Sequence, residues 1–122
     1  MLFRSCFRVL ETKHLPHGWD CSLLFEETGK TLFCSDLFGH GGNVEALTDG
    51  DIVGRSDTYN ARQQEGPMAG SVPYTHETKT ILEGLAALAP ATLACMHGSS
   101  FNGDGAQALR ELGDVLEKNF GP

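Results

Sequence analysis

CSLLFEETGKTLFCSDLFGHGGN, residues 21–43, is the stretch of sequence that decides the fold. Two apolar runs, 21–27 and 31–35, lie on either side of the turn TGK, and this pattern predicts a β-hairpin with Gly29 at the turn position that tolerates a positive φ. Asp36 directly follows the second run and enters a glycine-rich loop. A side chain fixed at a strand end is held more rigidly than one on a free loop, so we expect a ligand-binding position there.

Regular elements are expected on both sides of this hairpin. Alternation of apolar and polar residues, or a short continuous apolar run, predicts strands, and apolar residues at helical spacing predict helices. A polar stretch with turn signals predicts loop. The predicted order is a strand at 7–11, the hairpin, loop with short helical pieces at 44–73, a helix between Thr75 and Pro90, a buried strand at 91–96 and a helix from Asp104. This order predicts an α/β fold with a mixed β-sheet and helices.

The composition describes one acidic domain. The chain has 122 residues, 40% hydrophobic and 20% charged, which is enough for a single core over residues 1–122. Sixteen Asp and Glu against nine Lys and Arg give a net charge of −7, which argues against binding to nucleic acid or to an anionic membrane. No secretion signal is visible, and no apolar run reaches the roughly 18 residues that span a bilayer. We therefore expect a soluble, cytoplasmic protein.

The four cysteines are far apart in the sequence and include no C-x-x-C pair. Neither a zinc knuckle nor a thioredoxin-type redox pair is therefore predicted. We expect small buried thiols in a reducing cytoplasm rather than a disulfide framework. The residues concerned are Cys6, Cys21, Cys34 and Cys95.

Three polar residues, His17, Asp36 and His97, each lie where a predicted strand meets a loop. Imidazole nitrogen and carboxylate oxygen are the usual protein ligands of zinc and non-haem iron, so these residues are candidate metal ligands. The alternative is structural, because a His or Asp beside a glycine turn often caps backbone groups. The residue types alone leave both interpretations open.

The remaining polar candidates have simpler interpretations. His14 and His40 flank the same loops, and each is either an accessory ligand or a solvated or capping side chain. Ser99 and Ser100 are not expected to be nucleophiles, because the chain has no G-x-S-x-G motif and no partners spaced for a triad. Structural roles are expected for the rest: His76 at the surface, Trp19 as a packing anchor, and Ser99, Ser100, Asp20 and Asp104 as turn caps.

Three phrases of the sequence resemble a known family. PHGWD at 16–20, LFCSDLFG at 32–39 and LACMHGSSFNGDG at 93–105 are similar to the second half of a metallo-β-lactamase-fold protein, in the branch of flavodiiron and oxygen-binding di-iron proteins. The phrases occur in the expected order, and the resemblance covers nearly the whole chain. It implies that the fold is half of a metallo-β-lactamase-like αβ/βα sandwich.

The resemblance also implies a site. In the family the residue matching His17 binds one metal, that matching Asp36 bridges two metals, and that matching His97 binds the other, so this chain is expected to bind iron or zinc, as two ions. The His-x-(His or Glu)-x-Asp run that supplies the other ligands in the family is absent from this sequence. Three explanations stay open: a fragment of a longer protein, a half that pairs with another chain, or a remnant that has lost its site.

Two functions follow as expectations. The first is a metal-binding domain with an incomplete site, which acts as a hydrolase or binds oxygen when another chain completes it; enzyme status, substrate and choice of metal stay open. The second is a non-catalytic half-domain that acts through association. Since the missing half would leave an apolar sheet edge and face uncovered, both functions predict a homodimer or other homo-oligomer, or a complementary half-domain chain.

Overall fold

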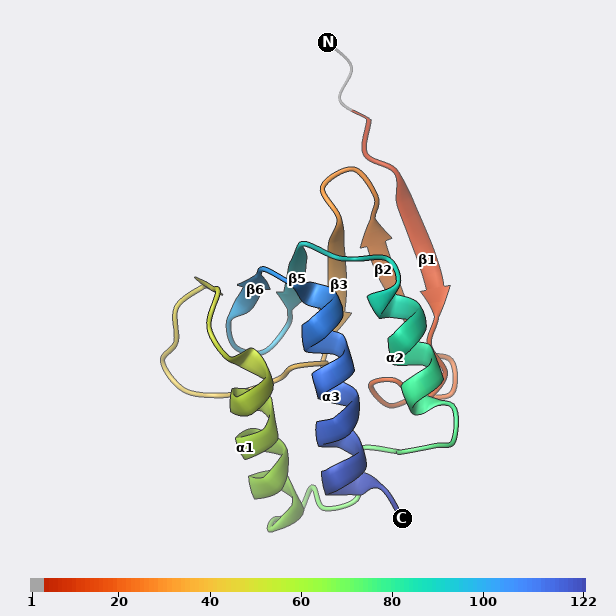
Figure 1. The fold of residues 1–122 in the computed structure, drawn as a ribbon. Helices are drawn as coiled ribbons and strands as arrows, with labels where there is room; N and C mark the ends of the chain where they lie inside the picture. Colours follow the sequence, from red (N-terminus) through yellow and green to blue (C-terminus); the bar gives the residue numbers. More distant parts are fainter. Residues whose placement is uncertain (1–3) are drawn as a thin grey trace.

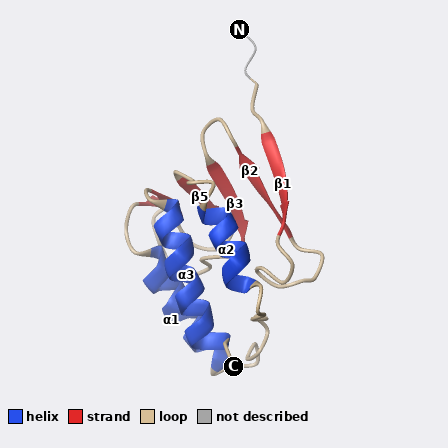
Figure 2. Cartoon of the chain, turned by 45° about the vertical axis from the view of Figure 1, so that its right-hand side comes forward, coloured by secondary structure: helices blue, strands red, loops and turns tan. Residues whose placement is uncertain are grey.

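The computed structural model describes residues 4–122, which form a six-stranded β-sheet with three helices on one of its faces (Figure 1). Figure 2, turned by 45°, shows the same two layers, with sheet behind and helices in front. The predicted α/β fold with a mixed sheet is confirmed. The strands are β1 (Phe7–Glu11), β2 (Ser22–Glu26), β3 (Thr31–Ser35), β4 (Leu47–Thr48), β5 (Thr92–Cys95) and β6 (Ser100–Asn102), and the helices are α1 (Ile52–Gln64), α2 (Thr78–Ala86) and α3 (Gly105–Phe120).

The strand order determines which loops meet. The order across the sheet is β1-β2-β3-β5-β6-β4. Strands β1, β2 and β3 are successively antiparallel, and β3 pairs in parallel with β5. The carboxyl ends of β1, β3 and β5 therefore lie at the same edge of the sheet, and the loops that follow them leave from that edge. These loops carry His17, Asp36 and His97.

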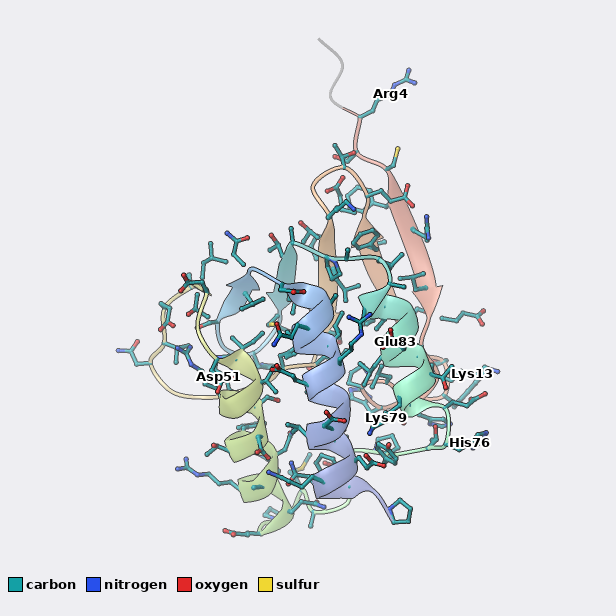
Figure 3. The ribbon with its side chains drawn as sticks, viewed as in Figure 1. Arg4, Lys13, Asp51, His76, Lys79 and Glu83 are labelled. Atoms are coloured by element: carbon teal, nitrogen blue, oxygen red, sulfur yellow. The ribbon has the colours of Figure 1, made fainter. Side chains whose placement is uncertain are left out.

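The face of the sheet toward the helices forms the core. Alternate strand residues point to this face, and apolar positions at helical spacing on α2 and α3 pack on them. The helices are joined to one another at their exposed edges: on α2, Lys79 binds Asp114 and Glu117 of α3, and Glu83 binds Arg110 of α3 (Figure 3 labels the α2 residues). Fully buried core residues include Leu32, Cys34, Leu82, Leu93, Leu109 and Leu112.

The opposite face of the sheet carries an apolar row with no helix over it. Val9 pairs with Leu24, Leu24 with Phe33, and Phe33 with Ala94, so these four side chains lie on one face and cross four strands. Val9 is 71% exposed and Phe33 is 42% exposed. Within residues 4–122 nothing covers this row, which we call the open face.

Helix α1 is longer than the sequence predicted. Instead of short helical pieces, a 13-residue helix begins at Ile52, with Asp51 accepting a hydrogen bond from the backbone N–H of Gly54 at its start (Figure 3). Only three residues of α1 are buried, and the rest of the helix is mostly polar. The sequence of α1 therefore shows little apolar periodicity. Contacts with α3 hold it instead: Lys118 and Asn119 both donate hydrogen bonds to Asp57.

Three smaller expectations needed correction. Helix α2 begins at Thr78 rather than Thr75, whose hydroxyl accepts a hydrogen bond from the N–H of Glu77 just before the helix. In the hairpin turn the positive φ falls on Lys30 (56°) and not on Gly29. Strands β4 and β6 were not predicted, because each is only two or three residues long.

The thiols are only partly buried. Cys34 is buried, Cys21 and Cys95 are intermediate and Cys6 is exposed, so the expectation of buried thiols holds fully for one of the four. All four are free cysteines, as expected. Within residues 4–122 no helix is both long enough and apolar enough to cross a membrane.

Candidate metal centre

His17, Asp36 and His97 lie in direct contact at one edge of the sheet. His17 Nε2 lies 2.8 Å from Asp36 Oδ2, and His97 Nε2 lies 3.1 Å from Asp36 Oδ1. Each oxygen of the carboxylate thus faces a different imidazole. The structure therefore brings together the three residues that the sequence singled out, although they come from three separate loops.

The donor atoms fit part of a two-metal centre. Ligand atoms that share one ion at about 2.1 Å lie about 3.0–3.4 Å from each other, close to both separations in this cluster. Asp36 would then bridge, sharing one ion with His17 and another with His97. Each ion would have two protein ligands here, and in the described part of the chain no three His, Cys, Asp or Glu side chains are placed so that all three could hold the same metal ion. These three residues therefore fit only part of such a centre.

The cluster is open to solvent. The side chains of His17 and His97 are 61% and 62% exposed, and that of Asp36 is 35% exposed. Ligands from outside this chain could therefore reach both positions.

The backbone around Asp36 is held in an uncommon conformation. Ser35 and Phe38 both have positive φ values, 51° and 62°, and the β3–β5 register shifts between Phe33 and Ser35. Non-glycine residues with positive φ persist only where their surroundings fix them, and such positions cluster at binding sites. Here the side chains of Leu37 and Phe38 are buried and anchor the turn, which directs Asp36 toward the two imidazoles.

His40 has a structural role rather than that of an accessory ligand. Its side chain is buried, its Nδ1 donates to the carbonyl of Phe38, and its Nε2 accepts from the backbone N–H of Ser99, both at 2.9 Å. Since both ring nitrogens are bonded to backbone groups, neither is available to a metal. His40 instead joins the loop that carries Asp36 to the loop that carries His97, so the capping interpretation of this residue is right.

Ser99 continues this connection to α1. Its hydroxyl donates to the carbonyl of Glu45 and accepts from Arg55, which also binds the Glu45 carboxylate at 2.7 Å. The Glu45 carboxylate accepts a hydrogen bond from the backbone N–H of Glu45 itself and another from Arg55, and these two bonds lower the pKa of Glu45 to about 2. Nothing in the sequence pattern pointed to Arg55 or Glu45, which lie in the stretch 44–73 that was interpreted as loop and short helical pieces.

The other candidates have mixed outcomes. Trp19 is 73% exposed, so the expectation of a packing anchor was wrong, and the buried Leu15 anchors this loop instead. His76 is exposed, as expected, and Asp104 caps α3 by accepting a hydrogen bond from the N–H of Gln107. His14 is half-buried, with a positive φ of 62°, and is not part of the cluster.

Two thiols lie on the strands that lead to the cluster. Cys34 on β3 is two residues before Asp36, and Cys95 on β5 is two residues before His97. A hydrogen bond with Cys95, together with burial, raises the pKa of Cys34, and the same bond lowers the pKa of Cys95. Each sulfur also contacts a backbone carbonyl of its own strand, that of Leu32 or Leu93. The thiols therefore belong to the packing of β3 against β5.

Solved structures with this arrangement of elements are known. The crystal structure of the flavodiiron protein from Giardia intestinalis matches 94% of this chain with a TM-score of 0.67 and 18% identity. The chain has the fold of one part of a flavodiiron protein. Rubredoxin oxygen:oxidoreductase from the anaerobe Desulfovibrio gigas matches 88% of the chain with a TM-score of 0.63 and 22% identity. The resemblance stated from the three sequence phrases is thereby confirmed at the level of the fold.

The likeness covers only part of the flavodiiron protein and of the Desulfovibrio oxidoreductase. This chain spans 28% of the length of the first and 27% of the length of the second. No family model matches the sequence, and no curated protein matches it either. The comparisons therefore establish the fold, and the roles of His17, Asp36 and His97 stay predictions.

Proposed function

We propose that this chain supplies half of a two-metal centre. His17 and Asp36 bind one ion, and Asp36 and His97 bind the other. The observation that carries the proposal is that the two oxygens of Asp36 face two different imidazole nitrogens, at 2.8 and 3.1 Å. This is the arrangement that a bridging carboxylate needs. The ions are iron or zinc, because imidazole and carboxylate serve both.

The remaining ligands come from outside this chain. Two protein ligands per ion are fewer than the three or four that zinc sites use. The open face supports a missing partner, since Val9 and Phe33 would leave water if a second layer packed on them. That layer is a second copy of the chain or a complementary half-domain. Such a partner would bring further ligands to the exposed imidazoles.

The completed centre acts on water or on oxygen. When bound, a pair of ions supplies either Lewis-acid activation of water for hydrolysis or redox chemistry toward dioxygen. The residues of this chain hold the site: Asp36 fixes the separation between the two positions, and His40 keeps the Asp36 and His97 loops together. We place this function in the cytoplasm, where free thiols such as Cys6 stay reduced.

A second candidate function needs no metal. The chain would be a non-catalytic half-domain that acts by association with itself or with a protein partner. The exposed apolar row of the open face favours this candidate independently of the His–Asp–His cluster.

The metal content of the purified chain distinguishes the metal-centre function from the non-catalytic one. The purified chain is loaded anaerobically with Fe(II), or with Zn(II), passed over a desalting column and analysed by elemental mass spectrometry. We expect near-stoichiometric retention that falls sharply in Asp36→Ala and is reduced in His17→Ala and His97→Ala. His76→Ala, which removes an exposed imidazole outside the cluster, is the matched control and should retain as much metal as the parent chain.

Equal metal retention by Asp36→Ala and His76→Ala would place the metal elsewhere. A chain that folds normally, as judged by circular dichroism, and retains no metal would overturn the metal-binding proposal and leave the association candidate.

A further inference from the structure

A pocket of about 510 Å³ lies beside the His17–Asp36–His97 cluster and extends between α1 and α3. These two helices lie side by side in both ribbon views (Figures 1 and 2). The volume is within the range of about 300–1,000 Å³ that is typical of small-molecule sites. His17, Asp36 and His97 line one part of this pocket, and the metal-centre proposal makes no use of the α1 and α3 residues that line the rest.

The walls of the pocket differ in chemistry. Ser56, Asn60 and Gln63 lie at helical spacing along α1 and present a hydroxyl and two amides. Leu112 and Leu116, one turn apart on α3, present an apolar surface, and both are nearly fully buried. A ligand that fits must therefore have one apolar face and one edge that forms hydrogen bonds.

The charge of the lining limits the ligand further. Among the described residues that line the pocket there is no lysine or arginine, and its two histidines, His17 and His97, are both engaged with its acidic residue, Asp36. An anionic ligand between α1 and α3 would have no lysine or arginine to pair with, and burial of an unpaired charge is costly. An uncharged ligand avoids this cost.

We propose that this pocket binds a small, uncharged organic molecule, with its apolar body on Leu112 and Leu116 and its hydrogen-bonding edge on the α1 wall. One end of the molecule lies next to Asp36. Binding of this molecule does not require a metal ion, because the α1 and α3 residues that line the pocket belong to the folded chain itself.

The test uses a neutral fluorescent probe, 6-propionyl-2-dimethylaminonaphthalene, which has an apolar ring system and a ketone. The chain is titrated with this probe in the presence of EDTA, so that a failure here leaves the metal proposal untouched. We expect a blue-shifted emission that saturates at one probe per chain. The anionic probe 1-anilinonaphthalene-8-sulfonate should bind at least about tenfold more weakly, as a missing charge partner predicts.

Matched variants locate the bound probe. Gln63→Trp fills the pocket and should weaken binding about tenfold or more, whereas Ala61→Trp, on the exposed side of the same helix, should not change it. Ser71→Trp fills the pocket from the opposite loop and serves if Gln63→Trp fails to fold. Phe33→Thr, on the open face, should leave binding unchanged.

Three results would overturn the proposal. The first is an absence of saturable binding. The second is equal binding by Gln63→Trp and Ala61→Trp, with Ser71→Trp also unaffected. The third is loss of binding in Phe33→Thr alone, which would place the probe on the open face. Tighter binding of the anionic probe would overturn the assigned ligand class.

Discussion

Gly98 packs directly against the imidazole of His40. A Cβ atom at Gly98 would lie 2.5 Å from both Cε1 and Nε2 of that ring, and Gly98 has a positive φ of 99°. The next residue, Ser99, donates its backbone N–H to His40 Nε2. The absence of a side chain at Gly98 therefore lets the loop after β5 close on the loop after β3, which sets His97 next to Asp36.

Gly98→Ala should consequently destabilise the fold and the cluster together. The added methyl group meets a buried ring and the backbone is unfavourable for alanine, so we expect a loss of about 2–4 kcal/mol in the free energy of unfolding. Urea denaturation followed by circular dichroism measures it. Gly41→Ala is the control in the same region, since a Cβ there has nothing within 4 Å. Equal stability of the two variants would show that the Gly98–His40 contact does not constrain the loops.

Asp104→Ala should destabilise α3 specifically. The Asp104 carboxylate accepts a hydrogen bond from the N–H of Gln107 at 3.0 Å and caps α3, which supplies more buried core residues than either of the other helices. Loss of such a cap costs about 1 kcal/mol. Asp49→Ala removes the same charge from an exposed loop position and should be nearly neutral in the same urea experiment. A comparable loss in both variants would mean that net charge, and not the cap, is responsible.

The sequence predicted the parts of the fold that carry strong apolar patterns. The hairpin and the strand near 91–96 were found because their strands are apolar runs, and α3 was found because its apolar residues recur at helical spacing. Helix α1 was not found, since its stability depends on Asp51 and on the Asp57 contacts with α3 rather than on an apolar stripe. Short-range patterns do not reveal contacts between residues that are distant along the chain.

The candidate site was predicted in part for a similar reason. His17, Asp36 and His97 could be chosen because each borders a predicted strand, and the parallel β3–β5 pairing then brings two of their loops to one edge. Trp19 was wrongly predicted to be a packing anchor, because the type of a side chain does not show whether other residues cover it in the fold. For His40 the sequence left the ligand and capping interpretations both open, because its partner Ser99 lies 59 residues away.

Acid should destabilise the chain through paired carboxylates. A hydrogen bond from its own N–H and another from Arg55 lower the pKa of Glu45 from 4.5 to about 2, and hydrogen bonds from Lys118 and Arg110 lower the pKa values of Asp57 and Glu83. Because these pKa values are lower in the folded state, the stabilisation is complete above the unfolded-state value, near 4.5 for Glu45, and is lost as the pH falls toward 2.

The measurement is the urea midpoint at intervals between pH 7 and pH 2. We expect a plateau at the upper end and a progressive decrease below about pH 5. Lys118→Met removes the cation beside Asp57 and should make the decrease shallower, whereas Arg4→Met, which removes an exposed cation near the N-terminus, should not. A midpoint that rises on acidification would contradict the assigned direction.

The open face should make the chain associate. Val9 and Phe33 lie in one cross-strand row and expose apolar surface that a second sheet could cover. If two copies substitute for the two halves of the sandwich, sedimentation velocity at micromolar concentration should show a dimer. Val9→Lys with Phe33→Lys should shift the chain to monomer, because two buried cations on each copy would face one another. Ala61→Lys with Thr80→Lys, which adds the same charge at exposed positions on two helices, should remain dimeric. A strict monomer in the parent chain would rule out self-association and leave a complementary half-domain as the partner.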